Sequence, residues 1–199
     1  MMKKILLLAL VCMMALGSVA LATATDEDVA RLLTIEPGTF EEPILLTSVG
    51  QSADVNIVNT LLTKAGMSDV RLATTAAADE VANYKTLVLA IGGSSKGLGA
   101  AGINETEELA RVQAVIAAAQ ENGVKILTLH VGGQARRGVL SDMFIPDAVK
   151  AANAMIVVKS GDAFESLKIS DMLFENEIPA AYVDNTAGVV EPLTALFAK

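Results

Sequence analysis

The fold is decided by residues 86–131, which read TLVLAIGGSSKGLGAAGINETEELARVQAVIAAAQENGVKILTLHV. This stretch begins with TLVLAI and ends with KILTLHV, two largely apolar runs without regular polar alternation. Strands that are buried on both faces of a parallel sheet have this pattern. Between the runs, residues 105–122 place apolar side chains at helical spacing. The stretch therefore predicts a strand, a helix and a second, parallel strand.

The boundaries of the predicted helix agree with local signals. Asn104 is followed by Glu107 three residues later, the spacing of a capping box, and Asn122-Gly123 is a common helix end. Glu107 and Arg111 have the i,i+4 spacing of a helical ion pair. The apolar stripe of this helix consists of Leu109, Val112, Val115 and Ile116.

The same alternation of strand and helix extends in both directions. The predicted strands are residues 44–48, 70–72, 86–91, 125–131, 155–158 and 180–183. The predicted helices are residues 53–65, 76–81, 105–122, 146–152, 163–176 and 187–198. Strict alternation with right-handed crossovers predicts an α/β, three-layer, doubly wound sandwich of the flavodoxin or Rossmann type, with a mostly parallel sheet of about five or six strands. We assign residues 43–199 to this single domain and residues 25–42 to an exposed leader with a short helix at most.

Residues 1–24 have the layout of a secretory signal peptide. Two lysines precede about fifteen apolar residues, and Ala-Thr-Ala at residues 22–24 is a cleavage signal. A membrane anchor is the alternative, but the run is shorter than the roughly 20 residues that a spanning helix needs, and three acidic residues follow it. We expect cleavage near Ala24 and an extracytoplasmic location, periplasmic or secreted.

The composition limits the possible partners. Cys12, the only cysteine, lies inside the predicted signal peptide, so the mature domain has no disulfide and depends on its buried core. The chain has 15 Lys and Arg against 23 Asp and Glu, a formal charge of −8, and loss of Lys3 and Lys4 lowers it to about −10. This charge argues against nucleic acid and anionic lipid. Tryptophan is absent and aromatic residues are only 4%, so small polar ligands fit better than sugars or nucleobases.

Three glycine-rich polar loops follow predicted strands. They are residues 47–54, 92–104 and 130–142. Ligands of open α/β sheets bind outside the carboxyl ends of the strands, where the strand order reverses. With the order 2-1-3-4-5, the first, third and fourth strands are neighbours, so the three loops converge on one crevice.

The second loop contains GxGxxG at Gly97, Gly99 and Gly102, but the context argues against a nucleotide. A dinucleotide fingerprint is expected after the first strand, and Lys96 is followed by glycine, which excludes a Walker P-loop. Export also removes the domain from NAD and ATP. We predict no cofactor.

Cationic residues in these loops suit an anion. Arginine forks and backbone amides bind carboxylate or phosphate oxygens, but the same arginines can instead pair with Asp54, Glu107 or Asp142. His130, the only histidine, is a candidate ligand contact or a histidine at the rim of the core. The predicted ligand-binding residues are Ser48, Gln51, Ser52, Ser94, Ser95, Lys96, His130, Arg136, Arg137, Ser141 and Asp142.

Catalysis and metal binding have weaker support. One histidine and no cysteine in the mature chain leave only carboxylates, which lack metal-ligand spacing, so no metal is predicted. A hydrolase needs a nucleophile beside a base and an orienting acid. A loop serine with His130 and Asp142 is one conceivable set, but no GxSxG elbow occurs, and no catalytic residue is assigned.

Four stretches also carry a family resemblance: EPILLTSVGQSADV, IGGSSKGLGAAGI, HVGGQARRGVLSD and FENEIPAAYVD. They resemble an uncharacterised exported bacterial family, domain-of-unknown-function family 6305, over roughly residues 43–197. The resemblance implies an exported α/β domain and gives no residue a role.

We therefore expect an exported domain that binds a small polar, anionic solute in the crevice, for uptake or sensing. A non-enzymatic interaction subunit of a membrane transporter or sensor is the first alternative. A small hydrolase that uses His130 is the second.

Overall fold

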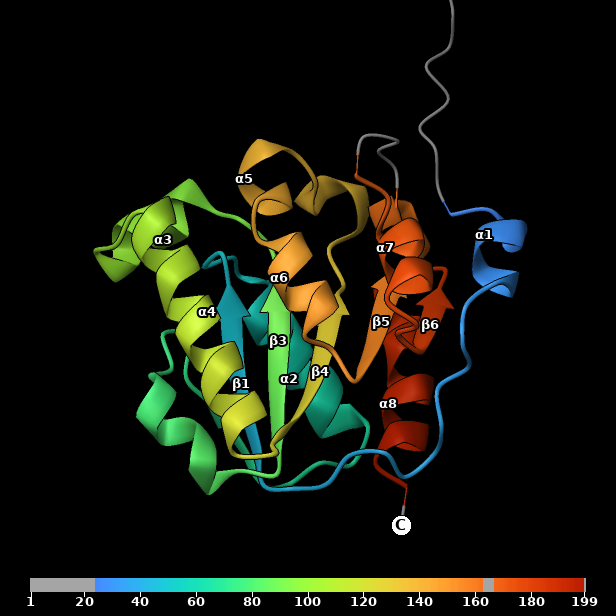
Figure 1. The fold of residues 1–199 in the computed structure, drawn as a ribbon, viewed down its shortest axis with the longest axis horizontal. Coiled ribbons are helices and arrows are strands. Elements are labelled where there is room, and N and C mark those ends of the chain that lie inside the picture. The colour runs from blue at the N-terminus through green and yellow to red at the C-terminus, as the bar shows by residue number, and fades with distance from the viewer. Residues whose placement is uncertain (1–23, 163–166, 199) are drawn as a thin grey trace, which may run out of the picture.

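A computed structural model describes residues 24–162 and 167–198, and its centre is a six-stranded sheet in the order β2-β1-β3-β4-β5-β6 (Figure 1). Every neighbouring pair is parallel. The strands are β1 (Ile44–Val49), β2 (Val70–Leu72), β3 (Thr86–Ile91), β4 (Lys125–His130), β5 (Ala154–Val158) and β6 (Ala180–Val183). The predicted α/β fold and strand order are confirmed, and the order reverses between β1 and β3.

Helices cover both faces of the sheet, which makes three layers. One face carries α4 (Glu105–Glu121), α6 (Ile145–Lys150) and α7 (Ile169–Glu175). The other carries α2 (Asp54–Lys64) and α8 (Val190–Leu196). Successive strand residues alternate between the two cores: Leu87 and Leu89 pack with α4, and Val88 packs with α2. Both faces of the central strands are buried, which explains why their sequences are apolar without alternation.

The loops after β3 and β4 contain helices that were not predicted. Residues 95–101 form α3 (Ser95–Ala101), because Ser94 accepts a hydrogen bond from the N–H of Gly97 and Gly102 ends the helix at φ 70°. The loop after β4 contains the 3₁₀ helix η2 (Gly133–Arg136) and the short helix α5 (Val139–Asp142). The strands in Figure 1 point toward α3 and α5.

Some predicted helices differ in their limits. Residues 76–81 correspond to the 3₁₀ helix η1 (Ala78–Asn83), and the last helix begins as η5 (Thr186–Val189) before α8. The 3₁₀ helix η3 (Lys159–Asp162) follows β5. Residues 163–166, the start of a predicted helix, lie outside the described residues, as do residues 1–23 of the predicted signal peptide.

The leader is less exposed than predicted. It contains α1 (Asp26–Ala30) and then runs along the domain. Phe40 is buried beside Phe197, and the backbone N–H groups of Gly38 and Phe40 donate to carbonyls at the end of α8. These contacts make residues 38–40 part of the folded domain. None of the helices in residues 24–162 and 167–198 has the length and hydrophobicity needed to cross a bilayer.

Candidate functional site

The three loops meet at the carboxyl edge, the side of the sheet where the strands end. A β-bridge joins Gln51 to Gly93. The N–H of Gly93 donates to Ser141 Oγ at 2.9 Å, and the N–H of Ser52 donates to the carbonyl of Gly92 at 3.1 Å. The convergence that the strand order predicts is therefore present, and direct hydrogen bonds join the loops.

The loops pack together without room for an added methyl group between them. A Cβ atom at Gly97 would lie 1.8 Å from the carbonyl oxygen of Gln51. A Cβ atom at Gly132 would lie 2.0 Å from Cγ of Arg136. These glycines bring parts of the same chain close to one another, which is one of the uses of glycine where backbone must approach closely.

Packing and helix geometry account for two of the three glycines in the GxGxxG sequence. Gly97 allows α3 to contact the loop after β1, and Gly102 ends α3 in the left-handed conformation. Gly99 faces open space, with no atom within 4 Å of an added Cβ. The motif lies within and at the end of α3, which follows the third strand and not the first.

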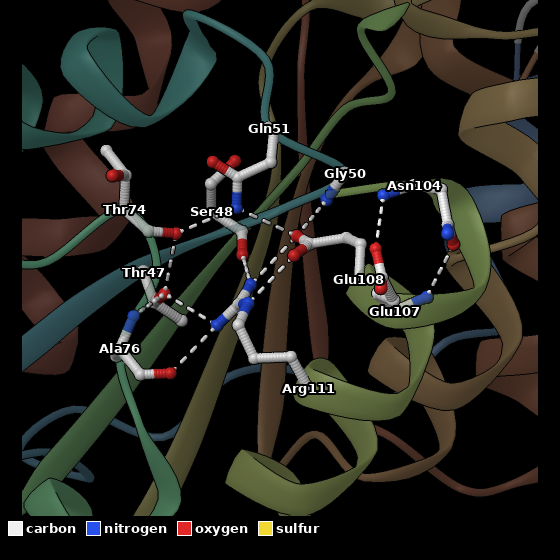
Figure 2. A network of polar contacts seen from close by, with 10 residues as sticks. All are labelled: Thr47, Ser48, Gly50, Gln51, Thr74, Ala76, Asn104, Glu107, Glu108 and Arg111. Atoms are coloured by element: carbon white, nitrogen blue, oxygen red, sulfur yellow. Dashed lines mark hydrogen bonds and ion pairs between the residues drawn. The ribbon is translucent and has the colours of Figure 1, made fainter. Parts of the chain in front are cut away.

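A buried ion pair beneath the loop after β1 was not predicted (Figure 2). Glu108 is 0% exposed and accepts hydrogen bonds from Arg111 Nε and Nη2, both at 2.8 Å. The expected pairing of Arg111 with Glu107 is wrong, because Glu107 closes the capping box with Asn104. The capping box itself is confirmed.

This pair ties α4 to the loop after β1. Glu108 also accepts from the N–H of Gly50 at 2.9 Å and from Gln51 Nε2 at 3.0 Å (Figure 2). Arg111 donates further to Thr47 Oγ1 and to the carbonyls of Ser48 and Ala76. All the donor positions of the guanidinium have partners within the protein, so the network stabilises the loop and leaves no group for a ligand.

Arg137 is also enclosed by the protein. Its side chain is 0% exposed, and Nε donates to Asp142 Oδ1 at 2.7 Å. Nη2 donates to the carbonyl of Leu167 at 2.7 Å, and Nη1 donates to the carbonyl of Gly161. Asp142 in turn accepts from the N–H of Gly138. The pairing with Asp142 lies within the loop after β4, and the bonds to Gly161 and Leu167 connect this loop to the segment after β5.

His130 lies under the same loop. It is 0% exposed, and Nε2 lies 3.2 Å from the carbonyl of Arg136, which requires the proton on Nε2. Nδ1 faces Gly161, and no hydrogen-bond partner of this atom is found in residues 24–162 and 167–198. Burial, aided by the charge of Arg137, lowers the pKa of His130. His130 is therefore a neutral core histidine at the end of β4.

Arg136 is the loop arginine that reaches solvent. Its Nε lies 3.0 Å from both carboxylate oxygens of Asp54, which is buried at the start of α2. The aliphatic part of its side chain lies over Gly132, and its carbonyl contacts His130. The side chain is 34% exposed, and no hydrogen bond from Nη1 or Nη2 is found among the described residues. We call these two nitrogens the Arg136 fork.

A family model described as a domain of unknown function, DUF6305, matches residues 41–197. The chain belongs to the DUF6305 family. The matched region runs from the residues before β1 to the end of α8 and includes all three loops of the carboxyl edge. It confirms the resemblance that the four stretches carry. A search of curated proteins gives no significant match.

The other predicted site residues of the DUF6305 domain divide into two groups. Ser48, Gln51, Ser52 and Ser141 are buried within the joined loops. Ser94 caps α3, while Ser95 and Lys96 are exposed on that helix. Among the described residues, no hydrogen bond or ion pair joins the exposed pair to Arg136. The structure thus separates a solvent-facing set from a larger set that holds the loops together.

The geometry gives no support to a serine nucleophile with His130. Within the described residues, the hydrogen bonds of His130 and Ser141 lead to the carbonyl of Arg136 and the N–H of Gly93, and Asp142 pairs with Arg137. Nowhere in residues 24–162 and 167–198 do three His, Cys, Asp or Glu side chains gather to hold a metal ion.

Two hollows of the DUF6305 domain lie away from the carboxyl edge. One, of about 1100 Å³, lies between residues 37–42, 65–68 and 194–198. The other, of about 250 Å³, lies between α4 and α6. Neither is lined by the three loops. The Arg136 fork therefore lies at neither hollow, and the three joined loops pack closely beneath it.

The buried His130 predicts a pH dependence of stability. Its pKa is lowered in the folded state. Below about pH 6.5, the pKa of histidine in the unfolded chain, the imidazole is therefore protonated in the unfolded chain but stays neutral in the folded chain. The free energy of unfolding is highest above pH 6.5 and falls, by at most about 1.4 kcal/mol per pH unit, until the folded pKa is reached. Urea unfolding between pH 7.5 and 5.5 measures this slope.

The variant His130→Gln lacks the titrating group and is the control for that experiment. Its unfolding free energy should fall less steeply over the same range, since only carboxylates remain to titrate. Equal slopes in both proteins, or a ring NMR titration of the single histidine at an ordinary pKa, would show that His130 is accessible to protons.

Proposed function

We propose that this DUF6305 domain is a non-enzymatic binding domain for small polar anions, and that the Arg136 fork is its contact with the ligand. The observation that carries the proposal is that the guanidinium nitrogens of Arg136 have different surroundings. Nε donates to the buried Asp54, whereas Nη1 and Nη2 make no hydrogen bond to the described part of the chain, and the side chain is 34% exposed. Two parallel N–H donors match the two oxygens of a carboxylate or phosphate group.

The surroundings of Arg136 support this role by fixing the side chain before a ligand arrives. Asp54, Gly132 and the carbonyl contact with His130 hold three different parts of the residue. The side chain of Arg136 is therefore already ordered before a ligand binds, which lowers the entropy cost of binding. The protein as a whole is acidic and repels anions at long range, but salt screens this repulsion. Anion binding therefore depends on the direct contacts that the fork makes.

A thermal-shift comparison tests the role of Arg136. At constant ionic strength, citrate, phosphate and sulfate should raise the Tm of the wild-type domain in proportion to their binding. Arg136→Lys keeps a cation beside Asp54 but removes the fork, so most of the shift should disappear. Arg71→Lys is the matched control, because Arg71 pairs with Glu80 on another part of the surface. Equal shifts in both variants would refute the assignment.

We further propose that the domain acts outside the cytoplasm in uptake or sensing, after removal of residues 1–24. The backbone N of Thr25 lies 3.0 Å from Asp28 Oδ2. Hydrolysis of the peptide bond between Ala24 and Thr25 converts this N–H into an ammonium group at the same place, where it would pair with the carboxylate. Intact-mass analysis of the exported protein should therefore give a chain that begins at Thr25. A chain that retains residues 1–24, or one that starts well inside α1, would contradict the proposal.

A further inference from the structure

The helix α5 carries an apolar face that the fold leaves uncovered. Val139 is 94% exposed and Met143, four residues later, is 40% exposed. Met143 is the C-cap of α5 and has helical backbone angles, so it lies one turn after Val139 on the same side. We call Val139 and Met143 the α5 face. Single exposed apolar residues are ordinary on protein surfaces, but this pair is adjacent in space and lies next to a functional candidate.

The α5 face is presented by a well-anchored segment. Leu140 and Ser141 pack against Gly93, and the N–H of Asp142 donates to the carbonyl of Gly138 at 2.8 Å. Asp142 is also held by the buried Arg137. A partner that contacts Val139 and Met143 would meet side chains on a fixed support and would not have to order the loop.

Val139 follows Arg136 by only three residues, so the two α carbons are at most about 11 Å apart. One partner surface can therefore cover both the fork and the α5 face. Arginine and methionine are enriched at protein interfaces, and an arginine beside apolar side chains is a common energetic centre of such contacts. Neither of the two hollows described above lies at the fork, and a partner surface would supply a wall beside it.

We infer that the anion recognised by Arg136 is a carboxylate carried by a partner protein, and that the α5 face fills an apolar hollow beside that carboxylate. This inference rests on the proposed function and names the carrier of the anion. The positive fork attracts the partner's acidic group. Burial of Val139 and Met143 against the partner adds apolar contact area that a free carboxylate cannot offer. Free small carboxylates then bind the same fork more weakly than the partner does.

Selection from a display library of random peptides, with the chain from Thr25 as bait, tests the inference. The enriched peptides should place Asp or Glu next to bulky apolar residues. Their Kd, measured by fluorescence anisotropy, should rise about tenfold or more for Arg136→Lys and also for the double variant Val139→Ser, Met143→Ser. Ile57→Ser, a change of an exposed apolar residue on α2, is the matched control and should stay within about twofold.

A double-mutant cycle identifies the carboxylate. Changing the peptide's acidic residue to its amide should weaken binding to the wild type strongly and to Arg136→Lys little. The α5 variants replace exposed side chains, so the folded domain should keep its Tm, which the same preparations can confirm.

The possible failures are distinguishable. If Arg136→Lys weakens peptide binding but the double variant does not, the proposed function stands and the inference about the α5 face is wrong. If the double variant weakens binding and Arg136→Lys does not, both are wrong. Enrichment of no peptide, enrichment of peptides without acidic residues, or binding to phosphatidylglycerol vesicles that depends on Val139 and Met143 would each overturn the inference.

Discussion

Glu108→Ala is expected to lower the free energy of unfolding by about 3–5 kcal/mol, the cost typical of breaking a buried ion pair from one side. Glu108 is fully buried, and its removal leaves Arg111, only 16% exposed, without its countercharge. The N–H of Gly50 and the side-chain amide of Gln51 also lose their acceptor. Urea unfolding followed by circular dichroism measures the loss.

Glu107→Ala is the matched control, because Glu107 is the neighbouring residue and its carboxylate only caps the exposed start of α4. This change should cost about 1 kcal/mol, the usual value of a lost cap. The double change Glu108→Leu, Arg111→Met removes both charges together and should cost less than Glu108→Ala alone. Equal losses for Glu107→Ala and Glu108→Ala would show that the network of Figure 2 is not formed in solution.

Gly97→Ala should destabilise the domain by about 3 kcal/mol, the upper end of ordinary overpacking costs. The new methyl group would lie 1.8 Å from the carbonyl oxygen of Gln51, a backbone atom that cannot turn aside as a side chain does. The loop after β1 or the helix α3 must then move. The measurement is again the free energy of unfolding, with the Tm as a second readout.

Gly99→Ala uses the second glycine of the same GxGxxG sequence as its control. Gly99 lies in α3 with nothing within 4 Å of an added Cβ, so alanine should be neutral or stabilising by up to about 1 kcal/mol through its helix propensity. A large loss at Gly99 with none at Gly97 would contradict the packing account and reopen a ligand role for the motif.

The sheet was predictable because the burial of the central strands is visible in their own apolar sequences. A strand such as β3 is buried on both faces and is therefore apolar without alternation, and strict alternation with helices leaves little freedom in topology. The helix α3 was not predicted, since its two glycines hide a helical segment that Ser94 starts and Gly102 ends.

Whether the loops of the carboxyl edge pack on a ligand or on one another was harder to predict from sequence. Glycine at a strand end permits close approach by a ligand or by another loop, and the sequence is the same in both cases. Only the packing of Gly97 on Gln51 and of Gly132 on Arg136 identifies the neighbour as the chain itself. The pairing of Arg136 with Asp54 likewise depends on contacts between segments 82 residues apart.

The buried Glu108 did leave a signal. It precedes Val112 by four residues and Val115 by seven, so it lies on the core side of α4. Arg111 is equally able to reach Glu107 or Glu108 by spacing alone, and the helix orientation decides between them. A carboxylate in the apolar stripe of a predicted helix is thus a marker of a buried polar network.

The central claim is that the fork of Arg136, and neither Arg137 nor Arg111, contacts the anion. NMR of a domain with ¹⁵N-labelled arginine side chains, titrated with acetate at constant ionic strength, tests this most directly. We predict saturable shifts of the Arg136 guanidinium with a Kd in the millimolar range, while Arg137 and Arg111 remain unchanged. Shifts that are absent at Arg136, or equal to those of Arg71 on the distant surface, would contradict the account.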